Sequence, residues 1–153
     1  MKDPCDDIRD WLYTSMNGMI SYAGKTVPVY SFPPEDVSYP YIVIGEHNAE
    51  GEESAKDRYR WDVATMLEIC SELDVHDASY LPVNNISTQI MQLLRVSYPE
   101  GGYGYGQDEG AVAMNNFNVI RVRFGAFNTD RELGPTKVLI SKQLSINLLV
   151  EEN

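Results

Sequence analysis

The stretch "YRWDVATMLEIC", Tyr59 to Cys70, decides the fold class, because apolar and polar side chains alternate along its whole length. One face carries Tyr59, Trp61, Val63, Thr65, Leu67 and Ile69, and the other carries Arg60, Asp62, Ala64, Met66, Glu68 and Cys70. Successive side chains of a β-strand point to opposite faces. The stretch is therefore predicted to be a half-buried strand.

Two stretches nearer the C-terminal end repeat this period of two. In "FNVIRVRFGAF", Phe117 to Phe127, we expect one face to carry Ile120, Val122, Phe124 and Ala126, and the other to carry Arg121 and Arg123. In "KVLISKQLSINLLV", Lys137 to Val150, only Lys142 interrupts an apolar face made of Val138, Ile140, Leu144, Ile146, Leu148 and Val150. Both stretches are predicted to be strands.

Helical spacing occurs in two places. Asp3 can cap a helix that begins at Pro4, and Asn17-Gly18 is a plausible stop. The apolar positions of this helix are Ile8, Trp11 and Leu12, with Ser15 next in the spacing. A second helix is predicted from about Pro82, with the apolar stripe Ile86, Ile90, Leu93 and Leu94. These elements predict an α+β fold: a small, mostly antiparallel sheet of about four to five strands with two helices packed on one face.

The connections between these elements have distinctive compositions. In the segment Val29 to Glu46, Pro33 and Pro34 cannot donate to a sheet, so an ordered excursion is expected before the strand that contains "YIVIGEHN". The segment Ala49 to Asp57, "AEGEESAKD", is predicted to be a polar loop. Residues Ser97 to Asn116 are predicted to be a flexible insert rich in glycine and tyrosine.

Bulk properties limit the function. The 153 residues fit one domain, 1–153, with a hydrophobic core. The net charge of −11 repels the phosphate backbone, which argues against tight binding of nucleic acid. Neither an apolar run long enough for a membrane helix nor a signal-peptide core is present in the sequence, so we expect a protein made in a cytoplasm and no membrane partner.

A search for catalytic chemistry finds little. "GGYGYG", Gly101 to Gly106, has the glycines of a phosphate loop but follows a helix and lacks the Lys-Ser/Thr ending. One face of an extended chain would carry the metal-ligand types Cys70, Glu72, Asp74 and His76, although one imidazole at this spacing is not a usual zinc pattern. Neither histidine lies in a recognisable catalytic setting. We therefore expect no enzyme activity, no cofactor and no metal.

The order of elements resembles the small tail-completion proteins of tailed bacteriophages, the tail terminator and head-to-tail joining family. The clearest piece is "YPYIVIGE", Tyr39 to Glu46, which follows a short "VPVY" strand. The resemblance extends from about Asp6 to Val150. This chain differs from many relatives in its long segment Ser97 to Asn116, where they have a shorter link.

This resemblance implies a structural virion protein, made in the host cytoplasm and located in the neck or tail. Such a protein forms a homo-oligomeric ring at the head-to-tail junction or tail end and joins the neck or connector to the tail tube. Its partners would be neighbouring copies and the adjoining neck, connector and tail proteins of a phage. DNA would pass through the lumen of the ring without specific binding.

Two sets of residues are candidates for assembly contacts. Opposite charges on neighbouring copies would involve Glu50, Glu52, Glu53, Asp57, Arg121 and Arg123. For the two arginines, a solvated outer face is the alternative. A docking loop would use Tyr98, Tyr103 and Tyr105, since aromatic side chains in a glycine-rich segment suit an interface. A plain spacer is the alternative for that loop.

Two other classes of function remain open at this stage. The first is a cytoplasmic protein-binding adaptor with a similar α+β fold, which would be a soluble monomer or dimer. The second is a small hydrolase or metal protein that uses the face from Cys70 to His76.

Overall fold

The computed structural model describes residues 2–55, 58–94 and 114–152. Its helices are α1 (Cys5–Met16) and α2 (Leu81–Leu94). The short strands are β1 (Ser21–Tyr22), β2 (Lys25–Thr26) and β3 (Val29–Tyr30). The long strands are β4 (Tyr41–Ala55), β5 (Arg58–Asp74), β6 (Phe117–Leu133) and β7 (Lys137–Glu152).

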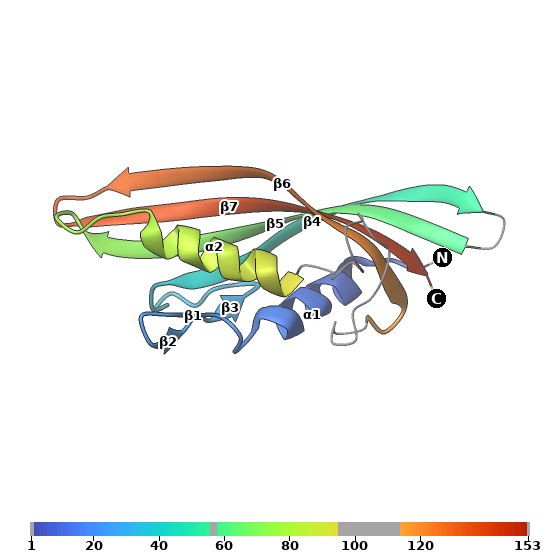
Figure 1. Cartoon of the computed structure of the whole chain (residues 1–153), viewed down its shortest axis with the longest axis horizontal. Coiled ribbons are helices and arrows are strands. Elements are labelled where there is room, and N and C mark those ends of the chain that lie inside the picture. The colour runs from blue at the N-terminus through green and yellow to red at the C-terminus, as the bar shows by residue number, and fades with distance from the viewer. Residues whose placement is uncertain (1, 56–57, 95–113, 153) are drawn as a thin grey trace.

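One five-stranded sheet, in the order β3-β4-β5-β7-β6, dominates the molecule (Figure 1). β3 runs parallel to β4 and pairs only with Ile42 and Val43, whereas every other neighbouring pair in this sheet is antiparallel. β1 and β2 form a separate two-stranded sheet. The predicted α+β class and mostly antiparallel sheet are confirmed within the described residues.

The core lies where the helices meet the sheet. α1 contacts β3, β4 and α2, while α2 contacts β5 and β7. The buried helical side chains are Ile8, Trp11, Leu12 and Met16 of α1 and Pro82, Val83, Ile86, Ser87, Ile90 and Leu94 of α2. Because the two helices lie over different strands, their placement over one shared face stays a prediction.

Both ends of α1 follow the sequence signals. The Asp3 Oδ1 atom accepts a hydrogen bond from the Cys5 backbone N–H at 2.9 Å, near the predicted start. Gly18 adopts a φ of 77° just beyond the last turn, a conformation that glycine adopts without steric cost. The helix is therefore bounded where the sequence indicated.

The predicted alternation is confirmed in β7 and in β5 from Val63 to Ile69, whereas Tyr59, expected on the buried face near the start of β5, is 45% exposed. Val63, Thr65, Leu67 and Ile69 are buried, while their polar neighbours on the other face are mostly more exposed. All the predicted apolar positions of β7 are buried as well: Val138, Ile140, Leu144, Ile146, Leu148 and Val150. These two strands form the centre of the sheet, where one face must be apolar along its length.

The predicted polar loop Ala49 to Asp57 is wrong, because β4 continues to Ala55 and its backbone pairs with β5 as far as Arg58. The predicted insert ends at Asn116, directly before β6 begins at Phe117, and most of it lies outside the described residues. Met114 is buried, and the Asn116 amide donates to Asp7 Oδ2 at 3.0 Å.

The predicted faces of β6 need a partial correction. Register shifts between Val119 and Arg121 and between Phe124 and Phe127 interrupt its alternation. Val122 and Phe124 pack against the core as expected, but Ile120 lies in the first irregularity and Ala126, in the second, is exposed. A bulge reverses the facing of the residues beyond it, and sequence periodicity does not reveal where a bulge occurs.

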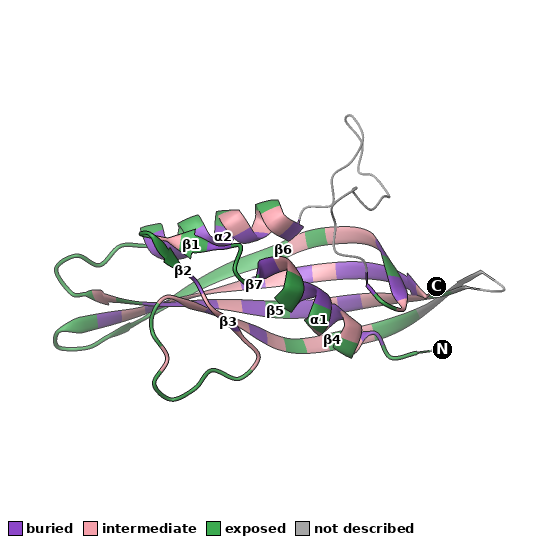
Figure 2. Ribbon diagram, turned by 90° about the horizontal axis from the view of Figure 1, so that it is seen from below, coloured by how far each residue is buried: buried purple, intermediate pink, exposed green. Residues whose placement is uncertain are grey.

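The long strands make the molecule elongated, and both ends of the sheet extend beyond the helices (Figure 1). At one end β4 and β5 project together, and at the other end β6 and β7 project with the end of β5. Figure 2 shows buried residues concentrated in the middle of the sheet and exposed residues toward the β6–β7 turn. The end at the β6–β7 turn is therefore surface rather than core.

Candidate assembly surface

The face of the sheet opposite the core is here named the outer face. On β5 it carries Arg60, Asp62, Ala64, Met66 and Glu68, which alternate with the buried positions, and then Cys70, which is itself buried. Met66, at the middle of this face, is 40% exposed. The outer face is thus a broad, largely polar surface on a rigid sheet.

Each flank of the sheet ends in a strand with an open edge. β3 covers β4 only at Ile42 and Val43, so within the described residues β4 from position 46 to 55 pairs with β5 alone. Among the residues that the structure describes, β6 from Val119 onward pairs with β7 alone. We name residues 46–55 the β4 arm and residues 119–124 the β6 arm. Open edges carry unpaired N–H and C=O groups that can pair with another chain.

The two arms have opposite charge. The β4 arm contains Glu46, Glu50, Glu52 and Glu53 and neither lysine nor arginine, whereas the β6 arm contains Arg121 and Arg123 and no acid. The Glu46, Glu50 and Arg123 side chains are exposed, and Arg121 is half-buried. Each arm therefore presents charge of one sign to solvent.

The register shows how the two arms lie relative to each other. Glu50, Asp62, Leu149 and Arg121 form one row across β4, β5, β7 and β6. Three strand spacings separate the ends of this row, which is about 14 Å. That distance is too long for an ion pair between Glu50 and Arg121 within one subunit.

A largely buried carboxylate on the outer face has a charged partner. Arg60 Nε donates to Glu151 Oε2 at 2.7 Å, and the Glu151 side chain is only 10% exposed. The pair links β5 to β7 beside the arms, because Arg60 and Glu151 are directly opposite in the register. It holds a carboxylate at a site that water hardly reaches.

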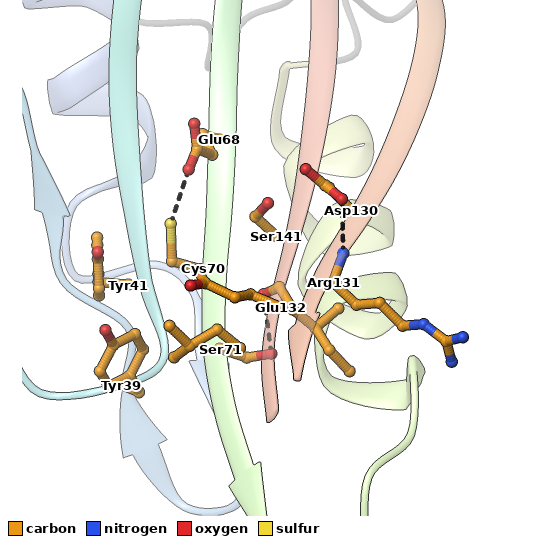
Figure 3. A pocket seen from close by; sticks show the side chains of 11 residues that line it. Tyr39, Tyr41, Glu68, Cys70, Ser71, Asp130, Arg131, Glu132 and Ser141 are labelled. Carbon is orange, nitrogen blue, oxygen red and sulfur yellow. Dashed lines mark hydrogen bonds between the residues drawn. The ribbon is translucent and has the colours of Figure 1, made fainter. Parts of the chain in front are cut away.

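A hollow of about 220 Å³ lies on the outer face, near the other end of the sheet (Figure 3). Its lining includes Tyr39, Tyr41, Glu68, Cys70, Asp130 and Glu132. Cys70 Sγ donates to Glu68 Oε1 at 3.1 Å, and burial raises the pKa of the Cys70 thiol to about 12. Burial also raises the pKa of Tyr41. Both groups are therefore protonated at neutral pH, and the thiol is a poor nucleophile.

The face from Cys70 to His76, which was considered as the site of a metal protein, does not bring metal ligands together. Cys70 is engaged with Glu68, and Asp74 Oδ1 lies 2.8 Å from Lys137 Nζ in an exposed ion pair. In residues 2–55, 58–94 and 114–152, no group of three His, Cys, Asp or Glu side chains is arranged to hold a metal ion.

The other candidate residues divide into three groups. Glu50, Arg121 and Arg123 lie on the arms, as described above. Glu52 and Glu53 lie on β4, and for them the structure describes the backbone only. Asp57, together with the proposed docking residues Tyr98, Tyr103 and Tyr105, lies outside the described residues.

His47 is a half-buried polar residue beside the core, which the sequence did not reveal. Its Nδ1 atom is 2.8 Å from the hydroxyl of the buried Thr65, and burial lowers the pKa of the imidazole. A register shift between Ile44 and His47 turns this side chain toward the core side of β4. Local sequence could not predict that reversal.

Comparison with solved structures shows what this chain is similar to in fold. A solved structure described as "Virion of native gene transfer agent (GTA) particle" contains a chain that aligns with a TM-score of 0.58 and 11% sequence identity. The alignment covers 93% of this chain and 92% of that chain. The two chains share a fold. At this identity the likeness extends to the fold alone, but it includes nearly the whole of both chains.

Sequence comparisons add no relatives, since no protein-family model and no curated protein matches this chain. Among the helices that the structure describes, none has the length and apolar character needed to cross a membrane.

Proposed function

We propose that this chain is a structural virion protein that forms a ring at the head-to-tail junction or the tail end and joins the neck or connector to the tail tube. The observation that carries the proposal is the pair of oppositely charged, open-edged arms on the two flanks of one rigid sheet. The shared fold with a chain of a gene transfer agent virion supports the virion setting.

The arrangement of the arms favours a ring over a two-fold dimer. A contact between the acidic flank of one copy and the basic flank of the next uses two different surfaces, so every copy keeps one flank of each kind free. Such heterologous contacts repeat until the rotation closes. A two-fold dimer would instead bring the same patch of both copies together.

The proposed role is not enzymatic. The hollow on the outer face offers a protonated thiol and phenol rather than an activated nucleophile. The net charge of −11 suits a ring through which DNA slides, because a negative lumen repels the phosphate backbone. Binding of double-stranded DNA at micromolar affinity in physiological salt would contradict this part of the proposal.

Native mass spectrometry of the purified chain tests the ring. We expect one closed oligomer with a fixed number of copies, and electron micrographs of the same sample should show rings. A monomer or dimer at every concentration would favour the alternative, a cytoplasmic protein-binding adaptor of similar fold. Bound zinc in the native mass would favour a metal protein instead.

A further inference from the structure

The long strands alternate in direction across the sheet. β4, β5, β7 and β6 are neighbours in that order, and each neighbouring pair is antiparallel. β4 and β6 therefore run in opposite directions at the two flanks. Rotation about an axis roughly along the strands brings β6 of one copy beside β4 of the next, and the antiparallel alternation continues across the boundary.

The two arms also lie at the same level of the sheet. The register shift in β4 lies between Ile44, opposite Leu67, and His47, opposite Thr65. On the next strand, β7, Leu144 is opposite Leu67 and Ile146 is opposite Thr65. On β6, Phe127 is opposite Leu144 and Phe124 is opposite Ile146. The second register shift of β6 lies between these two phenylalanines. Both arms thus begin at one row, and β3 occupies the edge of β4 only below that row.

Charge complementarity is confined to this level. Above the row, the β4 arm carries only acidic charges and the β6 arm only basic ones. Below it, residues 127–133 of β6 carry the mixed set Asp130, Arg131 and Glu132. At the level of the arms, β6 of a neighbouring copy would therefore meet opposite charge and an edge of β4 that β3 does not cover. Below that level it would meet neither.

We propose that the β4 arm of one copy pairs edge to edge with the β6 arm of the next, so that the sheets of the ring join into one continuous antiparallel sheet. This inference rests on the proposed ring and specifies its interface. Backbone hydrogen bonds between the arms satisfy the open edges, as closure does in a β-barrel. The facing charges select the partner flank and fix the orientation.

Carbodiimide cross-linking tests the pairing directly. The variant Arg121→Lys with Arg123→Lys keeps the charge of the β6 arm and supplies primary amines, which the reagent joins to carboxylates in contact as amide bonds. Rings are assembled from a mixture of ¹⁵N-labelled and unlabelled copies, and the cross-linked peptides are identified by mass spectrometry. We expect cross-links between copies from the β6 arm to the β4 arm.

Two other outcomes would overturn the pairing and are distinguishable. In the first outcome, rings form, but the cross-links from the β6 arm reach carboxylates outside the β4 arm or join only residues of the same copy. This result overturns the edge pairing and leaves the proposed ring intact. Failure of the unsubstituted chain to form rings overturns the proposed function as well.

Charge reversal provides a second, independent test. Arg121→Glu with Arg123→Glu should weaken association of the copies at least about tenfold in analytical ultracentrifugation, because like charges then face each other. Adding Glu46→Lys and Glu50→Lys should restore much of the loss. Arg131→Glu, on the same strand below the arm, is the matched control and should change association less than about twofold. Equal association of the unsubstituted chain and the double arginine variant would overturn the pairing.

Discussion

The substitution Arg60→Met tests the charged pair on the outer face. Removing one partner of a fully buried pair costs about 3–5 kcal/mol, whereas exposed pairs contribute about 0–1 kcal/mol. The Glu151 side chain is 10% exposed and that of Arg60 is 37% exposed, so this pair lies between the two limits. We expect Arg60→Met to lower the free energy of unfolding by about 1–3 kcal/mol, since methionine keeps much of the apolar stem but removes the charged Nε–H donor from the Glu151 carboxylate.

Circular dichroism during heating of dilute protein measures this loss. In a chain of this size each 1 kcal/mol shifts Tm by roughly 2–4 °C, so the expected decrease in Tm is roughly 2–12 °C. Arg60→Met with Glu151→Leu should be more stable than Arg60→Met alone, because no buried charge remains. The exposed Arg131→Met is the control and should change the free energy of unfolding by less than about 0.5 kcal/mol. An unchanged Tm in Arg60→Met, or a double variant no more stable than the single one, would refute this reasoning.

Three further substitutions test other parts of the structure. Burial holds the pKa of His47 below its ordinary value of 6.5, so the unfolded chain takes up the proton first and stability falls as the pH drops below about 6.5. Chemical denaturation at several pH values should show that the free energy of unfolding depends less on pH in His47→Asn than in the unsubstituted chain. An equal pH dependence in the two proteins would contradict the lowered pKa of His47. Leu144→Ala, at a fully buried position, should cost about 2–5 kcal/mol in guanidinium titration, against less than about 0.5 kcal/mol for Leu133→Ala, which is 66% exposed. Gly45→Ala would place its Cβ 2.9 Å from a backbone oxygen of β5 and should lower the free energy of unfolding by about 1–3 kcal/mol. The control Gly51→Ala, whose Cβ would lie 3.6 Å from its nearest neighbour, should lower it less. Equal losses of stability in the two variants would contradict the close approach at Gly45.

The central strands were predictable because each buries one face along its length. The exception that the sequence showed in β7, Lys142, has a physical explanation in the structure. Its Nζ atom donates to Asn84 Oδ1 at 2.8 Å and lies 5.3 Å from the centroid of the Phe127 ring. The ammonium group thus reaches a polar partner at the start of α2 while its stem lies along the sheet.

The acidic continuation of β4 was not predictable from local composition. The segment from Ala49 to Ala55 contains glutamate, glycine and serine, residues that are not typical of strands. It is a strand because its backbone pairs with β5 as far as Arg58, with one register shift between Glu53 and Ala55. Tertiary pairing here overrides a weak local preference, and it turns a predicted charged loop into a rigid charged edge.

The candidate surface was predictable only in part. The residue types of the acidic and basic strips were evident, and Glu50 and Arg121 were candidates before their positions were known. Their shared row, the bulges at one level and the Arg60–Glu151 pair depend on strand order and register. Sequence periodicity carries no information on which strands become neighbours, so these features required the structure.

Electron cryo-microscopy of the particles produced by the genome that encodes this chain tests the central claim most directly. We expect density for a closed ring of copies at the junction between capsid connector and tail or at the tail end, with the β4 arm of each copy beside the β6 arm of the next. Particles that lack the chain, or that contain it as separate copies not joined into a ring, would contradict the account.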